Sequence, residues 1–342
     1  MQKLLKNNIN FFKNKTLLIT GGTGSFGKAF VKFLLTKKIP LKKIIIFSRD
    51  ELKQHEMSLI YSEEKFSNIR YFLGDIRDKS RLLSAFENVD IVIHAAALKQ
   101  VVAAEYNPIE FIKTNVIGSQ NIIECSLQLG VQNIVALSTD KASSPINLYG
   151  ATKLCADKLF SSANNIKGIK KVKFSIVRYG NVMGSRGSVL HSFIEQKKNN
   201  KLLITDPSMT RFNIMLEEAI NMVMWAIFNS QGGEIFVPKI PSFNITDLAK
   251  AVCEKCAIKI IGIRPGEKIH EEMISSFDSK NTFDLNKYYA IVPENLIKLY
   301  KNKNFKLVDK NFSYNSKSNK DFIGISDLKK IVKNFCKEEV AK

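Results

Sequence analysis

Acid–base chemistry is concentrated in one short stretch of this sequence, STDKASSPINLYGATK, which runs from residue 138 to residue 153. An apolar run ends immediately before it, so a buried strand would present these polar side chains at its carboxyl end. The stretch holds a hydroxyl, a carboxylic acid, a phenol and two amines that could act together. These candidate catalytic residues are Thr139, Asp140, Lys141, Tyr149 and Lys153.

Tyr149 and Lys153 are one helical turn apart and therefore share a helix face. A phenol with a pKa of about 10 is a weak base, and lowering that pKa by ~3 units requires about 4 kcal/mol. An ammonium group at ~4 Å supplies energy of that order. We therefore expect Lys153 to lower the pKa of Tyr149, with Thr139 in the same hydrogen-bond cluster. The spacing alone is weak evidence, because a Tyr-x-x-x-Lys pair is common on ordinary helix surfaces.

A glycine-rich loop follows the first apolar run of the chain and precedes a helical pattern. Its glycines are spaced G-x-x-G-x-x-G, which lets the backbone approach a pyrophosphate while N–H groups at the helix start face the anion. Glycines also make ordinary turns, but the strand–loop–helix order favours a dinucleotide site. The predicted cofactor contacts in this loop are Gly21, Thr23, Gly24, Ser25, Phe26 and Gly27.

The end of the second predicted strand bears on the choice of cofactor. A carboxylate there would hold the ribose 2′-hydroxyl of NAD, whereas an arginine suits the 2′-phosphate of NADP. Ser48 and Arg49, with Lys53 one turn later, favour NADP. Asp50 leaves NAD open, although we expect it to cap the next helix. Further predicted cofactor contacts are Asp75, Ile76, Ala95 and Ala96, and we expect the neighbouring His94 to be a core histidine and not a catalyst.

Short apolar runs alternate with helical patterns through the first half of the chain, which predicts βαβ units. The expected fold is α/β, a doubly wound parallel sheet of the Rossmann type, with strands near 16–20, 44–48, 71–74, 91–96, 134–138 and 174–179. We expect residues 1–180 to bind the cofactor and residues 181–342 to form mainly a smaller substrate-binding lobe and a tail. Residues 216–238, with a helix at 216–229, are expected to return to the sheet. The pattern over 275–318 is too weak to assign.

Composition argues against several other classes of protein. The net charge of +20 comes mainly from lysines scattered in short doublets, which is typical of solvated faces, and no nucleic-acid-binding motif accompanies it. No apolar run reaches the ~18 residues that a membrane span needs. Lysines and asparagines interrupt the N-terminus, so a signal peptide is not indicated and a cytoplasmic location is expected.

Five cysteines show no spacing that is typical of a disulfide framework. Cys253 and Cys256 form a C-x-x-C, but we place both in a helix over 245–257 with no second pair and no nearby histidine. We therefore interpret them as unreacted thiols and predict no metal site.

The glycine loop, the strand ending in Ser-Thr and the Tyr-x-x-x-Lys pair together resemble the extended short-chain dehydrogenase/reductase family, whose members act on nucleotide sugars. Asn115 matches that family's helix-embedded asparagine. The Asp-Lys after Thr139 is similar to inverting UDP-N-acetylglucosamine 4,6-dehydratases, whereas dTDP-glucose 4,6-dehydratases have Asp-Glu there. Similar segments cover about residues 15–275 and include GGTGSFGK, FSRDELKQ, HAAALKQV, VRYGNVMGSRGSV, ITDPSMTRF, GGEIFVPKIPS and IIGIRPGEKIHE.

This resemblance implies a reaction in which the sugar is oxidised at C4, loses water across C5–C6 and is reduced at C6. Tyr149 would take the proton of the 4-hydroxyl, protonated Asp140 would protonate the departing 6-hydroxyl, and Lys141, if held neutral by its surroundings, would remove the C5 proton. The resemblance also implies a homo-oligomer and a role in pseudaminic acid synthesis and flagellin glycosylation. The UDP-sugar contacts it implies are Lys99, Asn181, Arg186, Arg211, Arg264 and Glu267.

Two other functions remain open at this point. A nucleotide-sugar 4-epimerase would use Tyr149 and Lys153 with the same cofactor, but has no evident need for Asp140 and Lys141. A protein that senses NADP without catalysis would not need an intact Thr139, Tyr149 and Lys153.

Overall fold

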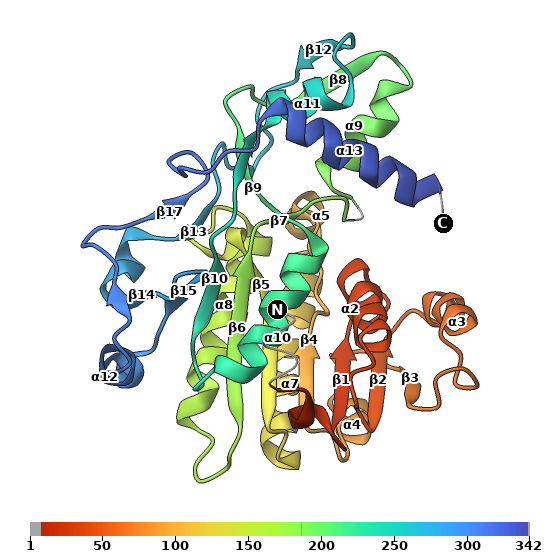
Figure 1. Ribbon diagram of the computed structural model, residues 1–342, viewed down its shortest axis with the longest axis vertical. Helices are drawn as coiled ribbons and strands as arrows, with labels where there is room; N and C mark the ends of the chain where they lie inside the picture. Colours follow the sequence, from red (N-terminus) through yellow and green to blue (C-terminus); the bar gives the residue numbers. More distant parts are fainter. Residues whose placement is uncertain (1–7, 186, 341–342) are drawn as a thin grey trace.

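A large twisted sheet forms the centre of the computed structural model, which describes residues 8–185 and 187–340 (Figure 1). Its strand order is β16-β14-β15-β10-β6-β5-β4-β1-β2-β3, and the run from β3 to β10 is parallel. The predicted doubly wound α/β fold is confirmed. The parallel strands are β1 (Thr16–Thr20), β2 (Lys43–Ser48), β3 (Ile69–Leu73), β4 (Ile91–His94), β5 (Asn133–Thr139), β6 (Lys173–Tyr179) and β10 (Ile235–Pro238).

These strands read as continuous apolar runs because helices cover both faces of the sheet. In β1, Leu17, Leu18 and Ile19 are fully buried between β2 and β4. Helices α2 and α10 pack together on one face, and α4, α7 and α8 pack together on the other. The helices of the part of the chain that surrounds the parallel strands are α2 (Ser25–Thr36), α3 (Glu51–Ile60), α4 (Lys79–Ala85), α5 (Val101–Tyr106), α6 (Pro108–Phe111), α7 (Gly118–Leu129), α8 (Leu148–Ser162) and α10 (Leu216–Asn229). The shorter helical segments are η1 (Ile9–Phe12), η2 (Ile112–Ile117), η3 (Asp140–Ala142) and η4 (Ala163–Asn165).

A second hydrophobic core lies above the carboxyl ends of the parallel strands, at the top of Figure 1. Its members include Leu190, Phe193, Leu248 and Leu328. The elements that enclose it are α9 (Val189–Lys197), β8 (Lys201–Ile204), α11 (Ile245–Val252), β12 (Ala257–Ile260) and α13 (Ile325–Val340). A three-stranded sheet of β7 (Asn181–Val182), β9 (Thr210–Ile214) and β11 (Ser242–Asn244) lies between this core and the large sheet.

The region 275–318, which the sequence pattern did not assign, extends the large sheet. β15 pairs antiparallel with β10 and β14, and β14 pairs antiparallel with β16. β10, the strand at the end of 216–238, pairs parallel with β6. The remaining elements are β13 (Glu272–Ile274), η5 (Ser276–Asn281), β14 (Thr282–Asp284), β15 (Tyr288–Ile291), η6 (Glu294–Leu296), α12 (Ile297–Asn302), β16 (Lys306–Leu307) and β17 (Tyr314–Asn315).

The prediction for the C-x-x-C was wrong in two respects. Helix α11 ends at Val252, and the backbone is extended at Cys253. That change of direction brings the two sulfurs together, and Cys253 and Cys256 form a disulfide. Within the described ranges, no helix has both the length and the apolar character that crossing a bilayer requires.

His94 is buried at the end of β4, as predicted. Its Nδ1 lies 2.8 Å from Thr20 Oγ1 and its Nε2 lies 3.3 Å from Ser119 Oγ. Burial, with a smaller effect of Lys153, lowers the pKa of His94 to about 3. The imidazole is therefore neutral and serves the core, not catalysis.

We expect His94 to make the fold sensitive to acid. The unfolded chain binds a proton at His94 below its ordinary pKa of about 6.5, whereas the folded chain does so only near pH 3. The stability that neutral His94 contributes is fully present above the unfolded pKa. The free energy of unfolding then falls by about 1.4 kcal/mol per pH unit as the pH drops from the unfolded pKa toward the folded one. Urea unfolding at several pH values should show this slope and a shallower one in His94→Asn; equal slopes would contradict the assignment.

Candidate active site

The predicted catalytic residues meet at the carboxyl end of β5. The strand ends at Thr139, and the next residues form the tight turn η3. Thr139 Oγ1 donates to Asp140 Oδ1 at 3.0 Å, and Lys141 Nζ donates to the same oxygen at 3.0 Å. Lys141 Nζ also lies 3.5 Å from Oδ1 of Asn181 at the start of β7. A hydroxyl group and an amine therefore donate to the same carboxyl oxygen in this turn.

Helix α8 brings Tyr149 to this cluster. Asn147 caps the helix, because its Oδ1 accepts from Gly150 N at 2.7 Å. Gly150 has no room for a side chain, since a β-carbon there would lie 2.2 Å from Lys141 O. This close contact holds the first turn of α8 against η3 and places Tyr149, which is 8% exposed, beside Thr139 and Lys141.

The protonation of Tyr149 differs from the prediction. Burial raises the pKa of Tyr149 to about 12, and Lys141 and the hydrogen bond with Thr139 oppose this rise only in part. Lys153 does not supply the expected opposing charge: its Nζ donates to Leu137 O at 2.8 Å, and burial lowers its own pKa although Asp157 opposes this. Desolvation of the phenol thus has a larger effect on its pKa than the charge of Lys153, which was inferred from the helical-turn spacing.

The expectation of a neutral Lys141 was also wrong for this structure. Burial alone would lower the pKa of Lys141, but Asp140 and Glu271 outweigh it and raise that pKa. Lys141 Nζ lies 3.0 Å from Asp140 Oδ1 and 3.0 Å from Glu271 Oε1. Burial raises the pKa of Asp140, and Glu271 adds to this against the effect of Lys141. Among these interacting groups Lys141 keeps its proton, and Asp140 holds a proton more strongly than an exposed carboxyl does.

Glu271 is the residue of this cluster that the sequence analysis missed. It lies immediately before β13, is 2% exposed, and contacts the same nitrogen of Lys141 as Asp140 does. The available signal was a carboxylate in the segment GEKIHE, in which only Glu267 was singled out.

The segment 266–272 is held against the catalytic loop by several contacts. Asn147 Nδ2 donates to Gly266 O at 2.7 Å, and Lys268 Nζ donates to Ser143 O at 2.7 Å. Ser144 Oγ donates to Glu272 Oε2 at 2.7 Å. Because both sides of the loop are fixed, the position of Glu271 relative to Lys141 is fixed as well.

The predicted substrate contacts fall into two groups. Asn181, Arg211 and Glu267 line the catalytic cluster, whereas Lys99 and Arg264 are exposed, and Arg186 lies outside the described residues. Arg211 is 8% exposed, and its guanidinium donates to the carbonyls of Thr210, Lys268 and Ile269 at 2.8–2.9 Å. In this structure Arg211 thus holds the 266–272 segment in place. Its predicted contact with phosphate stays a prediction.

The glycine loop fits the pyrophosphate of a dinucleotide. Gly24 caps α2 without a side chain, so the first N–H groups of the helix at Ser25 and Phe26 face outward. Gly27 must be glycine, because a β-carbon there would lie 2.3 Å from Gly22 O. Gly21, with a φ of +64°, lies so close to the end of β4 that a β-carbon would be 2.8 Å from Ala96 N.

The loop after β2 contains the predicted ribose contacts. Thr23 Oγ1 and Ser48 Oγ are 2.8 Å apart, and Asp50 caps α3 by accepting from Lys53 N at 3.0 Å, as expected. Lys53 Nζ also pairs with Asp50. A charged carboxylate that is both a cap and an ion-pair partner has less capacity to bind a ribose.

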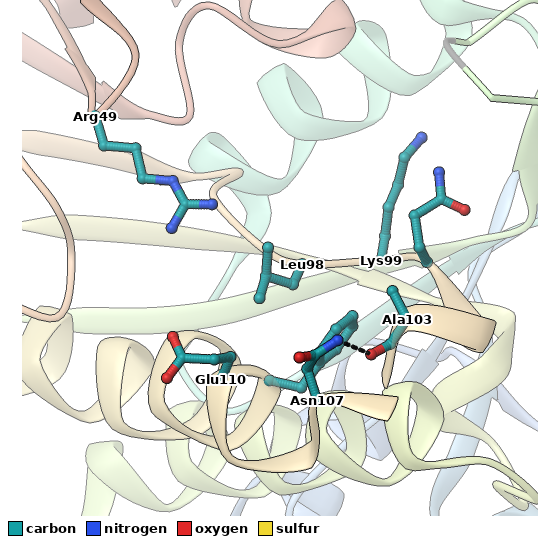
Figure 2. Close-up of a pocket in the computed structure, with 8 residues that line it drawn as sticks. Arg49, Leu98, Lys99, Ala103, Asn107 and Glu110 are labelled. Atoms are coloured by element: carbon teal, nitrogen blue, oxygen red, sulfur yellow. Dashed lines mark hydrogen bonds between the residues drawn. The ribbon is translucent and has the colours of Figure 1, made fainter. Parts of the chain in front are cut away.

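Arg49 faces a pocket of ≈ 320 Å³ beside this loop (Figure 2). The pocket is lined by Leu98 and Lys99 after β4 and by Asn107 and Glu110 near α6. Arg49 Nη1 lies 3.6 Å from Asp75 Oδ2, and its side chain is 52% exposed. An exposed guanidinium at this position can pair with a phosphate.

Asn115 connects the cofactor side of the site to α8. It lies in η2, a π-helical stretch, and is 1% exposed. Its side chain accepts from Leu98 N and donates to Leu98 O, each at 2.9 Å, and donates to Thr152 Oγ1 at 3.0 Å. The widened helical turn thus fixes the segment after β4 against the catalytic helix.

Known proteins share this arrangement of sequence and fold. A family model described as "Polysaccharide biosynthesis protein" matches residues 17–293. The chain belongs to this family. A solved structure of similar fold, described as "X-ray structure of Pen from Bacillus thuringiensis", is 38% identical with a TM-score of 0.86, covering 95% of this chain and 99% of that one.

Two curated relatives of this chain carry the names of two different activities. "UDP-N-acetylglucosamine 4,6-dehydratase (inverting)" from Campylobacter jejuni (strain 81-176) is 56% identical over 284 residues, covering 82% of this chain and 84% of the relative. "UDP-glucose 4-epimerase" from Rickettsia canadensis is 43% identical over 287 residues, covering 82% of this chain and 83% of the relative. The choice between the two activities rests on the site.

Proposed function

We propose that this protein is an inverting UDP-N-acetylglucosamine 4,6-dehydratase, a hydro-lyase that forms a UDP-2-acetamido-2,6-dideoxy-hexos-4-ulose with inversion at C5. The observation that carries the proposal is the buried contact of Asp140 and Lys141 beside Tyr149. An oxidation at C4 alone needs only the tyrosine, whereas loss of water needs an acid and a base in addition. The 56% identity to a relative of that name supports the same reading.

The residues divide the work as follows. Tyr149, hydrogen-bonded to Thr139, takes the proton of the sugar 4-hydroxyl after giving up its own proton, a loss that the charge of Lys141 favours against burial. NADP, held at the glycine loop, would supply the hydride acceptor for C4 and the hydride donor for C6. Lys141 removes the C5 proton that the 4-keto group has made acidic, and Asp140 protonates the leaving 6-hydroxyl. C5 then takes a solvent-derived proton on the opposite face when hydride returns to C6. The raised pKa of Asp140 supports its role as the acid.

Proton NMR in D₂O tests the dehydratase against its alternatives. Purified protein with UDP-N-acetylglucosamine should yield a 4-keto-6-deoxy sugar that carries deuterium at C5. A 4-epimer without loss of water would support the epimerase reading, which the 43% identical relative favours. Binding of NADP without any product would support a sensor, and product without deuterium at C5 would exclude the proposed elimination.

We further propose NADP over NAD, because Arg49 faces the pocket and Asp50 is engaged as a helix cap. Arg49→Ala should weaken NADP about tenfold or more and leave NAD unchanged, since a charge-assisted hydrogen bond contributes about 1.5–3 kcal/mol. Calorimetric titration of both cofactors measures this, with Arg70→Ala as the matched control. An equal loss for both cofactors would contradict a contact with the 2′-phosphate.

The family resemblance also supports proposals about context. The protein would act in the cytoplasm as a homo-oligomer, in pseudaminic acid-type sugar synthesis. Residues 1–180 would bind NADP, and the part from residue 181 onward would mainly hold the UDP-sugar.

A further inference from the structure

Glu271 stands in the active site without a role in the reaction as described so far. Its Oε1 lies 3.0 Å from Lys141 Nζ, the same distance that separates Lys141 Nζ from Asp140 Oδ1. Lys141 is thus placed between two carboxyl groups that come from distant parts of the chain. One of them, Asp140, is adjacent in sequence, and the other is brought in by the 266–272 segment.

The backbone of Glu271 is fixed from both sides. Its N–H donates to Ser316 Oγ at 2.9 Å, and its carbonyl accepts from Ser316 N at 2.8 Å. Its side chain is fixed by Lys141 and by Arg211, whose Nε lies 3.8 Å from Glu271 Oε1. The carboxylate therefore has little freedom to leave Lys141.

The second carboxylate oxygen, Oε2, is buried and accepts no hydrogen bond from any residue that the structure describes. A buried carboxylate with one unsatisfied oxygen is expensive as an anion. Burial favours the protonated form of Glu271, but the cations Lys141, Arg211 and Lys268 outweigh burial and lower the pKa of Glu271. The acidic groups that also face Lys141 are Asp140 and Tyr149.

We propose that Glu271 is the positioning residue that controls the proton of Lys141, holding it in the resting enzyme and accepting it from Nζ when the sugar is bound. This rests on the proposed dehydratase function. The proton crosses from Lys141 Nζ to Glu271 Oε1, so that an ammonium and a carboxylate become an amine and a carboxylic acid. The free amine then takes the C5 proton and becomes an ammonium again, and Asp140 supplies the proton that leaves with water.

The driving force is the removal of water by the substrate. A charged Lys–Glu pair and a neutral one differ chiefly in their need for solvation, and Lys141, whose side chain is 22% exposed, loses its solvent when a sugar covers the site. The resting structure favours the charged pair, because Asp140 and Glu271 together raise the pKa of Lys141. Transfer within the site makes the C5 step independent of proton release to solvent.

The test is Glu271→Gln, which keeps the size of the side chain but cannot accept the proton. The variant should still oxidise C4, seen as the near-ultraviolet absorbance of reduced nicotinamide when UDP-N-acetylglucosamine is added. Its dehydration near neutral pH should fall about 10²-fold. The remaining kcat should rise with pH by about tenfold per unit, because Lys141 must now lose its proton to solvent. The wild type should show a flat kcat over the same range.

Glu272→Gln is the matched control, because Glu272 is the adjacent carboxylate and contacts Ser144 instead of Lys141. It should keep the flat pH profile. Glu271→Asp, which can still accept a proton, should recover part of the lost rate without the new pH dependence.

Several outcomes overturn the inference. A pH profile of Glu271→Gln parallel to that of the wild type would exclude control of the Lys141 proton. Loss of C4 oxidation, or a lowered thermal unfolding temperature that accounts for the lost rate, would assign Glu271 a structural role. Wild-type protein that forms no dehydrated product would overturn the proposed function itself, whereas active wild type with an unaltered variant overturns the role of Glu271 alone.

Discussion

A Lys141→Arg enzyme should oxidise its sugar at C4 and then stop. Arginine keeps the positive charge between Asp140 and Glu271, but its guanidinium does not lose a proton in the range where proteins are stable. Reduced nicotinamide should therefore accumulate, while the 4-keto-6-deoxy product seen by NMR should decrease by about 10²–10⁴-fold.

The arginine variant distinguishes the role of Lys141 as a base from its role as a positive charge, whereas an alanine variant removes both at once. Lys141→Ala removes both the base and the charge, and it leaves the buried Asp140 without its ion-pair partner. If Lys141 served only as an ion-pair partner, Lys141→Arg would keep much of its dehydratase activity, and that result would refute the base assignment. Lys158→Arg, an exposed change on α8, is the control for the same substitution.

A Tyr149→Phe enzyme should lose both half-reactions. The change removes one oxygen from a side chain that is 8% exposed and keeps the ring that packs near Ala104 and Phe111. Without the phenol, the 4-hydroxyl has no group to take its proton, so the rate should fall by about 10²–10⁴-fold. Unlike Lys141→Arg, this variant should show no increase in reduced nicotinamide.

Burial raises the pKa of Tyr149 to about 12, so removing the phenol should leave the charge of the site unchanged. Sugar binding to Tyr149→Phe, measured by calorimetry, should remain within a few-fold of the wild type if the loss is catalytic. Tyr106→Phe, at a highly exposed position on α5, is the control for the chemical change. Reduced nicotinamide formed by Tyr149→Phe at the wild-type rate would show that another group takes the proton.

The sequence by itself determined the elements and their order. β1 was predicted over its observed range, and so was α10, because uninterrupted apolar runs and a helical period are local properties of the chain. The glycine loop, the cap at Asp50 and the strand end that precedes Asp140 were predicted for the same reason. The helix at 245–257 failed because its end at Val252 has no strong local signal.

Only the tertiary structure decided the charges in the site. The pKa of Tyr149 depends on how completely its ring is buried, and burial is a property of the whole packed molecule. Lys141 was expected to be neutral, but Glu271 comes from a segment far along the chain and stabilises its charge. Arg211, predicted to contact phosphate, holds that segment through its carbonyls. Spacing along a chain specifies which side chains share a helix face, whereas desolvation and contacts between distant segments set which of them carry a proton.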